Sequence, residues 1–197
     1  SVLASLLVLG ACTSPQSSQQ KTDYTQWVNP FIGTDFTGNT YPGAQAPFGM
    51  VQLSPDNGLG GWDRISGYFY PDSTIAGFSH THLSGTGAGD LYDVLFMPVT
   101  LPYKEAKGEL GIHSKFSHQD EEASAGYYRV KLQDYNINVE LTATPRCGVQ
   151  RYTFPKAESM VILNLKKAMN WDFTMDSQIE IVDSCNIRGY RFSEGWA

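Results

Sequence analysis

Alternation of hydrophobic and polar residues is clearest in the second half of the chain. Between residues 126 and 143 (GYYRVKLQDYNINVELTA), every second residue is hydrophobic on both sides of a turn at Asp134–Asn136. Side chains of a strand point alternately to its two faces, so a period of two is typical of a strand with one buried face. The stretch therefore predicts a hairpin of two half-buried strands.

Further segments look like strands separated by turn residues. They are residues 49–55, 92–100, 149–154, 160–165, 178–183 and 187–192. We find no convincing amphipathic helix after residue 12. A succession of strands separated by turn residues predicts an all-β fold, namely an antiparallel β-sandwich with long Gly/Pro-rich loops. Most glycines lie in residues 29–90, in loops of the kind that carry binding residues on a rigid sheet.

Composition and charge narrow the classes of partner. The 197 residues are 41% hydrophobic, which is enough for a core, and they carry a net charge of -6 with no basic run. Without a basic run, nothing offsets the repulsion between this net charge and the phosphates, which argues against a nucleic-acid partner. The charged run HQDEEASAG, residues 118–126, precedes the hairpin and is predicted to be a solvated turn.

The first twelve residues, SVLASLLVLGAC, form an apolar run too short to span a bilayer. Small residues directly before Cys12 resemble a bacterial lipobox, in which the cysteine becomes lipid-modified. We therefore expect residues 1–12 to be a truncated lipoprotein signal peptide and residues 13–26 to be a disordered tether. This predicts an exported bacterial lipoprotein, anchored to a membrane in the periplasm or at the cell surface; a plain secretory signal is the alternative. In such a compartment Cys147 and Cys185 could form a disulfide, or could be two small buried residues.

The stretch GFSHTHLSGTGAGD, residues 77–90, is too polar and too flexible to fill a core. His80 and His82 are two positions apart, so on a strand both would point the same way and could supply two zinc ligands, with Asp90 or Asp93 as the third. Alternatively, both histidines donate hydrogen bonds that fix the loop backbone. A phosphate site is disfavoured, because GTGAGD lacks the G-x-G-x-x-G spacing and a strand follows it.

The stretch LGGWDRISGYFY, residues 59–70, offers a surface for a sugar. Gly60 and Gly61 let the backbone bend, and Trp62 follows with Asp63 beside it. An aromatic plane suits the apolar C–H face of a sugar, while carboxylates, amides and histidines bond its hydroxyl groups. The alternative is that Trp62 is a core residue beneath the loops. Glycoside hydrolysis also needs a carboxylate pair, whose separation the sequence does not give. The candidates are Asp56, Asp63, Asp90, Asp93 and Asp172.

Five motifs carry a resemblance to a known family, namely VNPFIGT, GNTYPGAQAPFGMVQLSPD, SGYFY, GFSHTHLSGTG and GYYRVKL…VELTATPRCGVQRYTFP. They resemble the N-terminal part of glycoside hydrolase family 92, which comprises calcium-dependent, exo-acting α-mannosidases that invert anomeric configuration. The resemblance spans residues 27–197. It implies an N-terminal β-sandwich that packs against a C-terminal (α/α)₆ barrel of the same polypeptide. It further implies that the catalytic acid, the base and the Ca²⁺ ligands lie mainly in that barrel, so that this chain is a fragment.

The resemblance implies a parent enzyme of the α-1,2 type that removes terminal mannose from mannose-containing glycans. By position, the Gly-Trp-Asp stretch makes Trp62 the best candidate for a substrate contact, with Asp63, His80 and His82 as further candidates. No catalytic residue is assigned, and the fragment alone is expected to be inactive. Three other functions stay open: a non-catalytic carbohydrate-binding module, a zinc-dependent enzyme using His80 and His82, and a purely structural surface protein.

Overall fold

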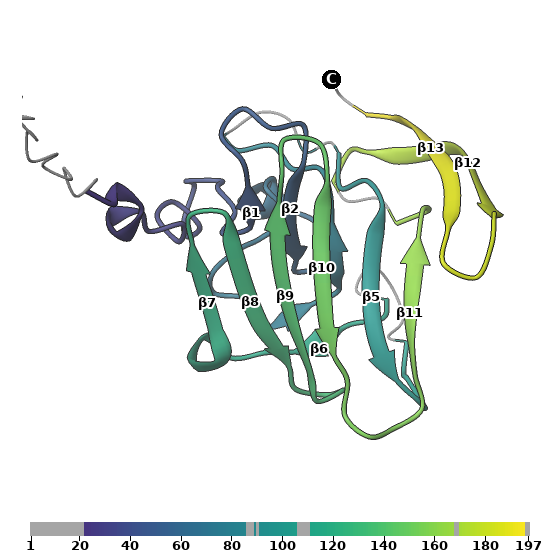
Figure 1. The fold of residues 1–197 in the computed structure, drawn as a ribbon. Helices are drawn as coiled ribbons and strands as arrows, with labels where there is room; N and C mark the ends of the chain where they lie inside the picture. The colour runs from purple at the N-terminus through teal and green to yellow at the C-terminus, as the bar shows by residue number, and fades with distance from the viewer. Residues whose placement is uncertain (1–21, 86–88, 90, 106–110, 168–169, 196–197) are drawn as a thin grey trace, which may run out of the picture.

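Strands make up nearly all of the regular structure (Figure 1). The fold is given by a computed structural model, which describes residues 22–85, 89, 91–105, 111–167 and 170–195. Within these ranges the helical elements are three short 3₁₀ helices, η1 (Tyr24–Trp27), η2 (Trp62–Arg64) and η3 (His118–Asp120). None of the described helices is long and apolar enough to cross a membrane. The predicted all-β class is confirmed.

Two antiparallel sheets form the sandwich. One sheet has the strand order β1-β2-β4-β5-β11 and the other has the order β10-β9-β8-β7, while β3-β6 and β12-β13 are separate pairs. The first strands are β1 (Ala44–Gln45), β2 (Gln52–Asp56), β3 (Thr74–Ile75), β4 (Gly77–Ser79), β5 (Leu95–Thr100) and β6 (Ser114–Lys115). They are followed by β7 (Glu121–Ser124), β8 (Tyr127–Leu132), β9 (Ile137–Ala143), β10 (Gly148–Thr153), β11 (Ser159–Asn164), β12 (Phe173–Ile181) and β13 (Ile187–Glu194). In Figure 1, β7 to β10 lie side by side in front of β1 and β2.

The core lies between the two sheets. The predicted hairpin of residues 126–143 is confirmed as β8 and β9, in which Val130 pairs with Val139 and Leu132 with Ile137. These four side chains are at most 2% exposed, and fully burying one of them contributes about 1.5–3 kcal/mol. The facing sheet contributes fully buried side chains to the same cluster: Leu53, Phe78 and Val99.

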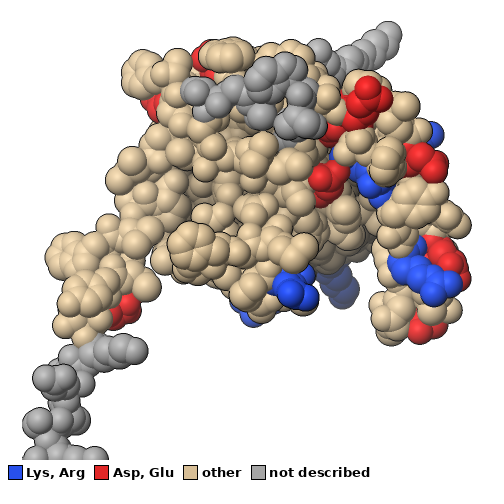
Figure 2. Space-filling model, turned by 90° about the horizontal axis from the view of Figure 1, so that it is seen from above, with Lys and Arg blue, Asp and Glu red and all other residues tan. Residues whose placement is uncertain are grey.

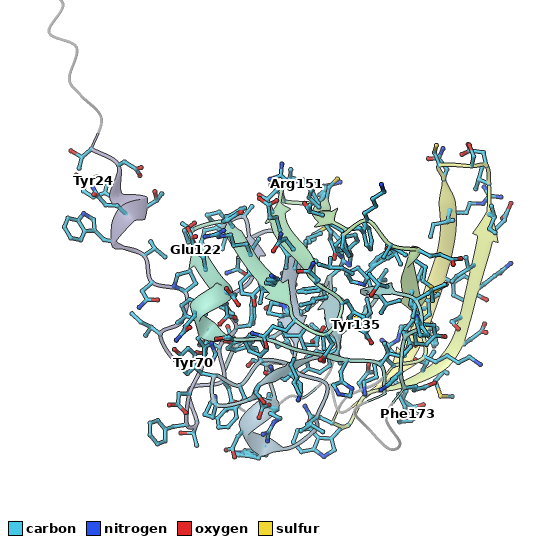
Figure 3. The ribbon with its side chains drawn as sticks, turned by 90° about the horizontal axis from the view of Figure 1, so that it is seen from below. Tyr24, Tyr70, Glu122, Tyr135, Arg151 and Phe173 are labelled. Carbon is cyan, nitrogen blue, oxygen red and sulfur yellow. The ribbon has the colours of Figure 1, made fainter. Side chains whose placement is uncertain are left out.

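The opposite face of the β7–β10 sheet is polar. Figure 3 shows Glu122 and Arg151 on this outer side, away from the core. Both belong to exposed ion pairs, Glu122 with Arg129 at 2.7 Å and Arg151 with Glu140 at 2.5 Å. The alternation seen in the sequence therefore corresponds to one buried and one solvated face of this sheet.

The hairpin of β12 and β13 is a separate two-stranded sheet beside β11, at the right of Figure 1. The segment predicted at 187–192 falls within β13, whereas the segment predicted at 178–183 overlaps β12, which begins earlier, at Phe173, and ends at Ile181. The hairpin carries apolar side chains that are between 46% and 78% exposed: Phe173, Met175, Ile179, Ile181, Ile187 and Phe192. This pattern is expected of strands that present an apolar surface to a further partner.

Two predictions about local environment are wrong. The charged run 118–126 forms η3 and β7, and it contains a buried carboxylate, Glu121, whose side chain is 1% exposed. The carboxylate accepts hydrogen bonds from the hydroxyl groups of Tyr68 at 3.0 Å and Tyr128 at 2.6 Å. Burial, and then the Glu121 charge, raise the pKa of Tyr68 well above its usual value, so this hydroxyl remains a donor.

The second wrong prediction concerns the cysteines. Cys147 and Cys185 are both exposed and free, so they neither form a disulfide nor lie buried in the core.

Candidate functional site

Trp62 lies at the start of a tight turn on the surface. The turn is η2, and the backbone N–H of Arg64 donates to the Gly61 carbonyl at 3.0 Å. Gly61, the residue that caps this turn, has a φ of 131° and a ψ of 163°, a conformation that is essentially restricted to glycine. Trp62 is 54% exposed and Asp63 is exposed beside it, so the alternative that Trp62 is a core residue is wrong.

A second tryptophan lies against Trp62. The ring centroids of Trp62 and Trp171 are 5.7 Å apart with an interplanar angle of 67°, which is an edge-to-face contact. Trp171 is 44% exposed, so the two indoles form an open aromatic corner. Sequence reasoning considered Asp172 but missed Trp171, because no local pattern reports a contact between residues so far apart along the chain.

His82 is a buried residue that supports the loop around it. It is 2% exposed. Its Nδ1–H donates to the Gln52 carbonyl at 2.7 Å. Its Nε2 lies 3.0 Å from a carboxylate oxygen of Asp56 and 3.2 Å from the Ser79 hydroxyl. Because both ring nitrogens are engaged within the chain, this geometry favours the alternative in which the histidine fixes loop backbone. A contact between His82 and a sugar stays a prediction.

His80 has different surroundings from His82. Its Nδ1–H donates to the Val94 carbonyl at 3.0 Å, and its ring packs edge-on against Phe96. Burial lowers the pKa of His80, so the neutral ring is favoured. The ring lines an apolar groove of about 290 Å³ that is formed with residues of β5, β11 and the β12-β13 hairpin. β4 ends at Ser79, so the two histidines lie beyond the strand, and the period of two does not determine their directions.

The described residues do not form a metal site. Among them, no group of three or more His, Cys, Asp and Glu side chains is arranged to hold an ion. Asp93, one expected third zinc ligand, accepts a hydrogen bond from Thr81 at 2.8 Å and pairs with Arg191. Asp90, the other, lies outside the described residues, as does most of GTGAGD.

The candidate carboxylates divide into buried and exposed groups. Asp56 is 1% exposed and contacts His82, while Asp93 and Asp172 both pair with the guanidinium of Arg191. Carboxylates held in buried ion pairs are poorly suited to exchange protons with a substrate. Asp63 is therefore the candidate that lies in the open, next to Trp62.

Comparison with known structures reveals close relatives of this chain. The GH92 α-mannosidase BT3965 from Bacteroides thetaiotaomicron, in complex with mannoimidazole, is 42% identical with a TM-score of 0.82, over 87% of this chain and 23% of that chain. The GH92 inverting mannosidase BT2199 from Bacteroides thetaiotaomicron VPI-5482 is 29% identical with a TM-score of 0.70, over 90% of this chain and 24% of that one. Both structures share the fold described above.

Two further comparisons agree with these structures. An uncharacterized secreted glycosidase of Arthroderma benhamiae is 29% identical over 158 residues, which are 77% of this chain and 20% of that protein. The chain thus spans about a fifth to a quarter of the length of its relatives. The model of the glycosyl hydrolase family 92 N-terminal domain matches residues 27–197. The chain therefore belongs to glycoside hydrolase family 92 and corresponds to the N-terminal domain of that family.

Proposed function

We propose that this domain is the N-terminal part of an exo-acting, inverting α-mannosidase of the α-1,2 type, and that Trp62 forms one wall of its sugar pocket. Family membership makes the parent a glycoside hydrolase, and the similar structures are of mannosidases. The observation that carries the proposal is the half-exposed indole of Trp62, presented on a hydrogen-bonded turn at the surface.

The chemistry of the Trp62 turn suits a hexose. The indole offers a flat apolar surface to the C–H face of a mannose ring, and the Asp63 carboxylate beside it can accept hydrogen bonds from hydroxyl groups. A rigid aromatic side chain also loses little conformational entropy on binding. The role of this domain is therefore to bind and orient the sugar and to keep water from one side of it.

The bond-breaking groups would come from a C-terminal helical barrel of the same polypeptide. An inverting glycosidase uses one carboxylic acid to protonate the leaving oxygen, and one carboxylate to activate a water molecule on the opposite face of the sugar. In this domain Asp56 is buried against His82, and Asp93 and Asp172 are committed to ion pairs with Arg191. A calcium ion, when bound by the barrel, would supply a hard cation that coordinates sugar hydroxyl groups.

The surface of the domain supports a large partner of this kind. The β1–β2 connection, at the top of Figure 1, carries Phe48 and Met50, which are 108% and 71% exposed. Figure 2 shows that the face seen from above has few charged residues, and that charges gather over the β12-β13 hairpin at its right. A charge-poor face with exposed apolar side chains is typical of an interface. We expect the domain alone to be inactive and prone to associate.

Hydrolysis of mannobiose linkage isomers by the full polypeptide tests the proposal. We expect turnover of the α-1,2 isomer with inversion, its loss when calcium is chelated, and a marked loss in the Trp62→Ala variant. Tyr103→Ala is a matched control, because Tyr103 is a 40% exposed aromatic residue at the far end of β5 from His80. Unchanged kinetics of Trp62→Ala would contradict the assigned role of Trp62, and a preference for another linkage would contradict the α-1,2 assignment.

A lipid anchor at Cys12 is part of the proposal. Residues 1–12 end in small residues followed by Cys12, and this segment lies outside the described residues. We expect radiolabelled palmitate to be incorporated into the full polypeptide in bacteria and the protein to sediment with membranes. A Cys12→Ala variant that keeps both the label and the membrane association would exclude this anchor.

A non-catalytic carbohydrate-binding module is the second candidate. It is favoured by the same aromatic corner, which needs no second domain to stack on a sugar, and by the pairing of Asp93 and Asp172 with Arg191. Calorimetric titration of the domain with mannose and mannobiose separates the two candidates. Binding by the domain, together with a full polypeptide that cleaves no mannoside, would favour the module.

A further inference from the structure

The turn that carries Trp62 is held by a segment more than a hundred residues further along the chain. The backbone N–H of Gly61 donates to the side-chain oxygen of Asn170 at 2.7 Å, across 109 positions. The side-chain amide of Asn170 donates in turn to the Arg64 carbonyl at 3.3 Å. One side chain therefore bonds both ends of the turn, and the Lys167 ammonium donates to the nearby Gly58 carbonyl at 3.3 Å.

Asn170 and Trp171 are well suited to this task. Asn170 has a φ of 55°, in the left-handed region that asparagine tolerates better than most residues. The next residue, Trp171, makes the edge-to-face contact with Trp62. Trp171 also packs on Gly89, where an added Cβ would lie 2.9 Å from the indole. Trp171 thus contacts both Gly89 and Trp62.

The segment that bears Asn170 and Trp171 is itself held in place by Arg191 of β13. Asp172 is buried and pairs with Arg191 of β13. The Nε–H of Arg191 donates to the Leu165 carbonyl at 3.2 Å and to the Thr174 hydroxyl at 3.0 Å, on either side of the segment. The Arg191 guanidinium thus holds Asp172, and the adjacent residue Trp171 contacts the exposed indole of Trp62.

We propose that Asn170 and Trp171 are positioning residues that fix the indole of Trp62 for sugar binding. This rests on the proposed function of Trp62. Without the Asn170 side chain, the turn keeps its own backbone hydrogen bond but loses the two bonds that orient it. Without Trp171, the indole of Trp62 loses the contact that restricts its rotation. A mobile indole must be ordered when the sugar binds, which weakens binding of the ground state and the transition state alike.

The inference predicts a particular kinetic signature in the full polypeptide. Asn170→Gly suits the left-handed backbone while removing both hydrogen bonds, and Trp171→Ala removes the aromatic contact. Each should raise KM for the cleaved mannobiose on the order of tenfold, with kcat changed by less than about twofold. Trp171→Phe should restore most of the affinity, because it keeps an aromatic edge. Asn170→Gly combined with Trp62→Ala should have no larger effect than Trp62→Ala alone.

A spectroscopic measurement tests the geometry without reference to activity. Two indoles in edge-to-face contact couple their transitions, so the circular dichroism spectrum should contain a coupled band that disappears in both Trp62→Ala and Trp171→Ala. The band should weaken in Asn170→Gly while the signal from the strands persists. If the band is unchanged in Asn170→Gly, or absent from the parent protein, the inference is overturned even where a variant expresses poorly.

The outcomes also separate this inference from the proposed function. A rise in KM for Trp62→Ala, with wild-type KM in both Asn170→Gly and Trp171→Ala, overturns the positioning role and leaves the function of Trp62 intact. Wild-type kinetics in Trp62→Ala overturns both. A fall in kcat with unchanged KM in the Asn170 and Trp171 variants also overturns the positioning role, because it shows an effect on the chemical step.

Discussion

Replacing Arg191 with methionine is expected to destabilise the domain strongly. The Arg191 side chain is 1% exposed, and its guanidinium pairs with Asp93 and Asp172. Methionine fills much of the same space but removes the cation from beside the Asp172 carboxylate, which is itself 2% exposed. A buried carboxylate that loses the cation beside it bears a desolvation cost that the lost attraction had offset.

The size of the effect follows from this burial. Removing one partner of a buried ion pair typically costs about 3–5 kcal/mol. Asp93 is 23% exposed, so water compensates part of its loss, and we expect a decrease of about 3 kcal/mol in the free energy of unfolding. In a domain of this size each 1 kcal/mol shifts the melting temperature by about 2–4 °C, which gives a decrease of roughly 10 °C.

Urea and thermal denaturation, followed by tryptophan fluorescence and circular dichroism, measure this decrease. Arg188→Met is the matched control on the same strand, because Arg188 is 71% exposed and its pair with Glu180 should contribute less than about 1 kcal/mol. Adding Asp172→Asn to Arg191→Met should recover part of the loss, since it removes the buried charge that Arg191 had balanced. Equal losses in Arg191→Met and Arg188→Met would refute the reasoning.

Three further predictions concern other parts of the domain. Burial lowers the pKa of His80 in the folded state, so the unfolded state takes up a proton more readily, and stability should fall as the pH decreases below about 6.5, by at most about 1.4 kcal/mol per pH unit. His80→Asn should flatten this dependence in urea titrations between pH 5 and 8, and an unchanged slope would contradict it. Glu121→Gln replaces a buried carboxylate that lies 2.6 Å from His118, so it should lower the free energy of unfolding by about 2–4 kcal/mol; a loss below 1 kcal/mol would show that the charge is dispensable. Gly61→Ala should cost about 1–3 kcal/mol locally and weaken sugar binding through Trp62, and calorimetry showing wild-type affinity would argue against a strained turn.

The sequence was most informative where one face of a strand is buried. The alternation in residues 126–143 predicted β8 and β9, because one face of each strand packs into the core. It failed for the start of β12, where Ser177 interrupts the alternation of apolar and polar residues. It also failed for Glu121, which is buried because donors from Tyr68, Tyr128 and His118 converge on it. Two of these donors, Tyr68 and Tyr128, lie outside the charged run, so the sequence of the run alone does not reveal them.

The candidate site shows the same limit. The glycines before Trp62 correctly indicated an exposed aromatic residue, because the signal lies within a few adjacent positions. Trp171 was missed because its contact with Trp62 depends on the path of the chain through the whole sandwich. The prediction that the two histidines point the same way assumed that they lie on a strand. However, β4 ends just before them, and the loop that follows places His82 in a buried cluster with Asp56.

Buried polar contacts, more than sheet pairing, determine the shape of the loops around this site. Three of the four residues in the segment 91–94 have φ values between 59° and 84°, namely Leu91, Tyr92 and Val94. Such conformations cost about 1–3 kcal/mol each and persist only where the surroundings impose them. The fourth residue, Asp93, is held by Arg191, which also holds Asp172 beside Trp171. One guanidinium thus fixes a strained loop and the support of the aromatic corner at once. Loss of Arg191 should therefore weaken sugar binding even at temperatures at which the variant remains folded.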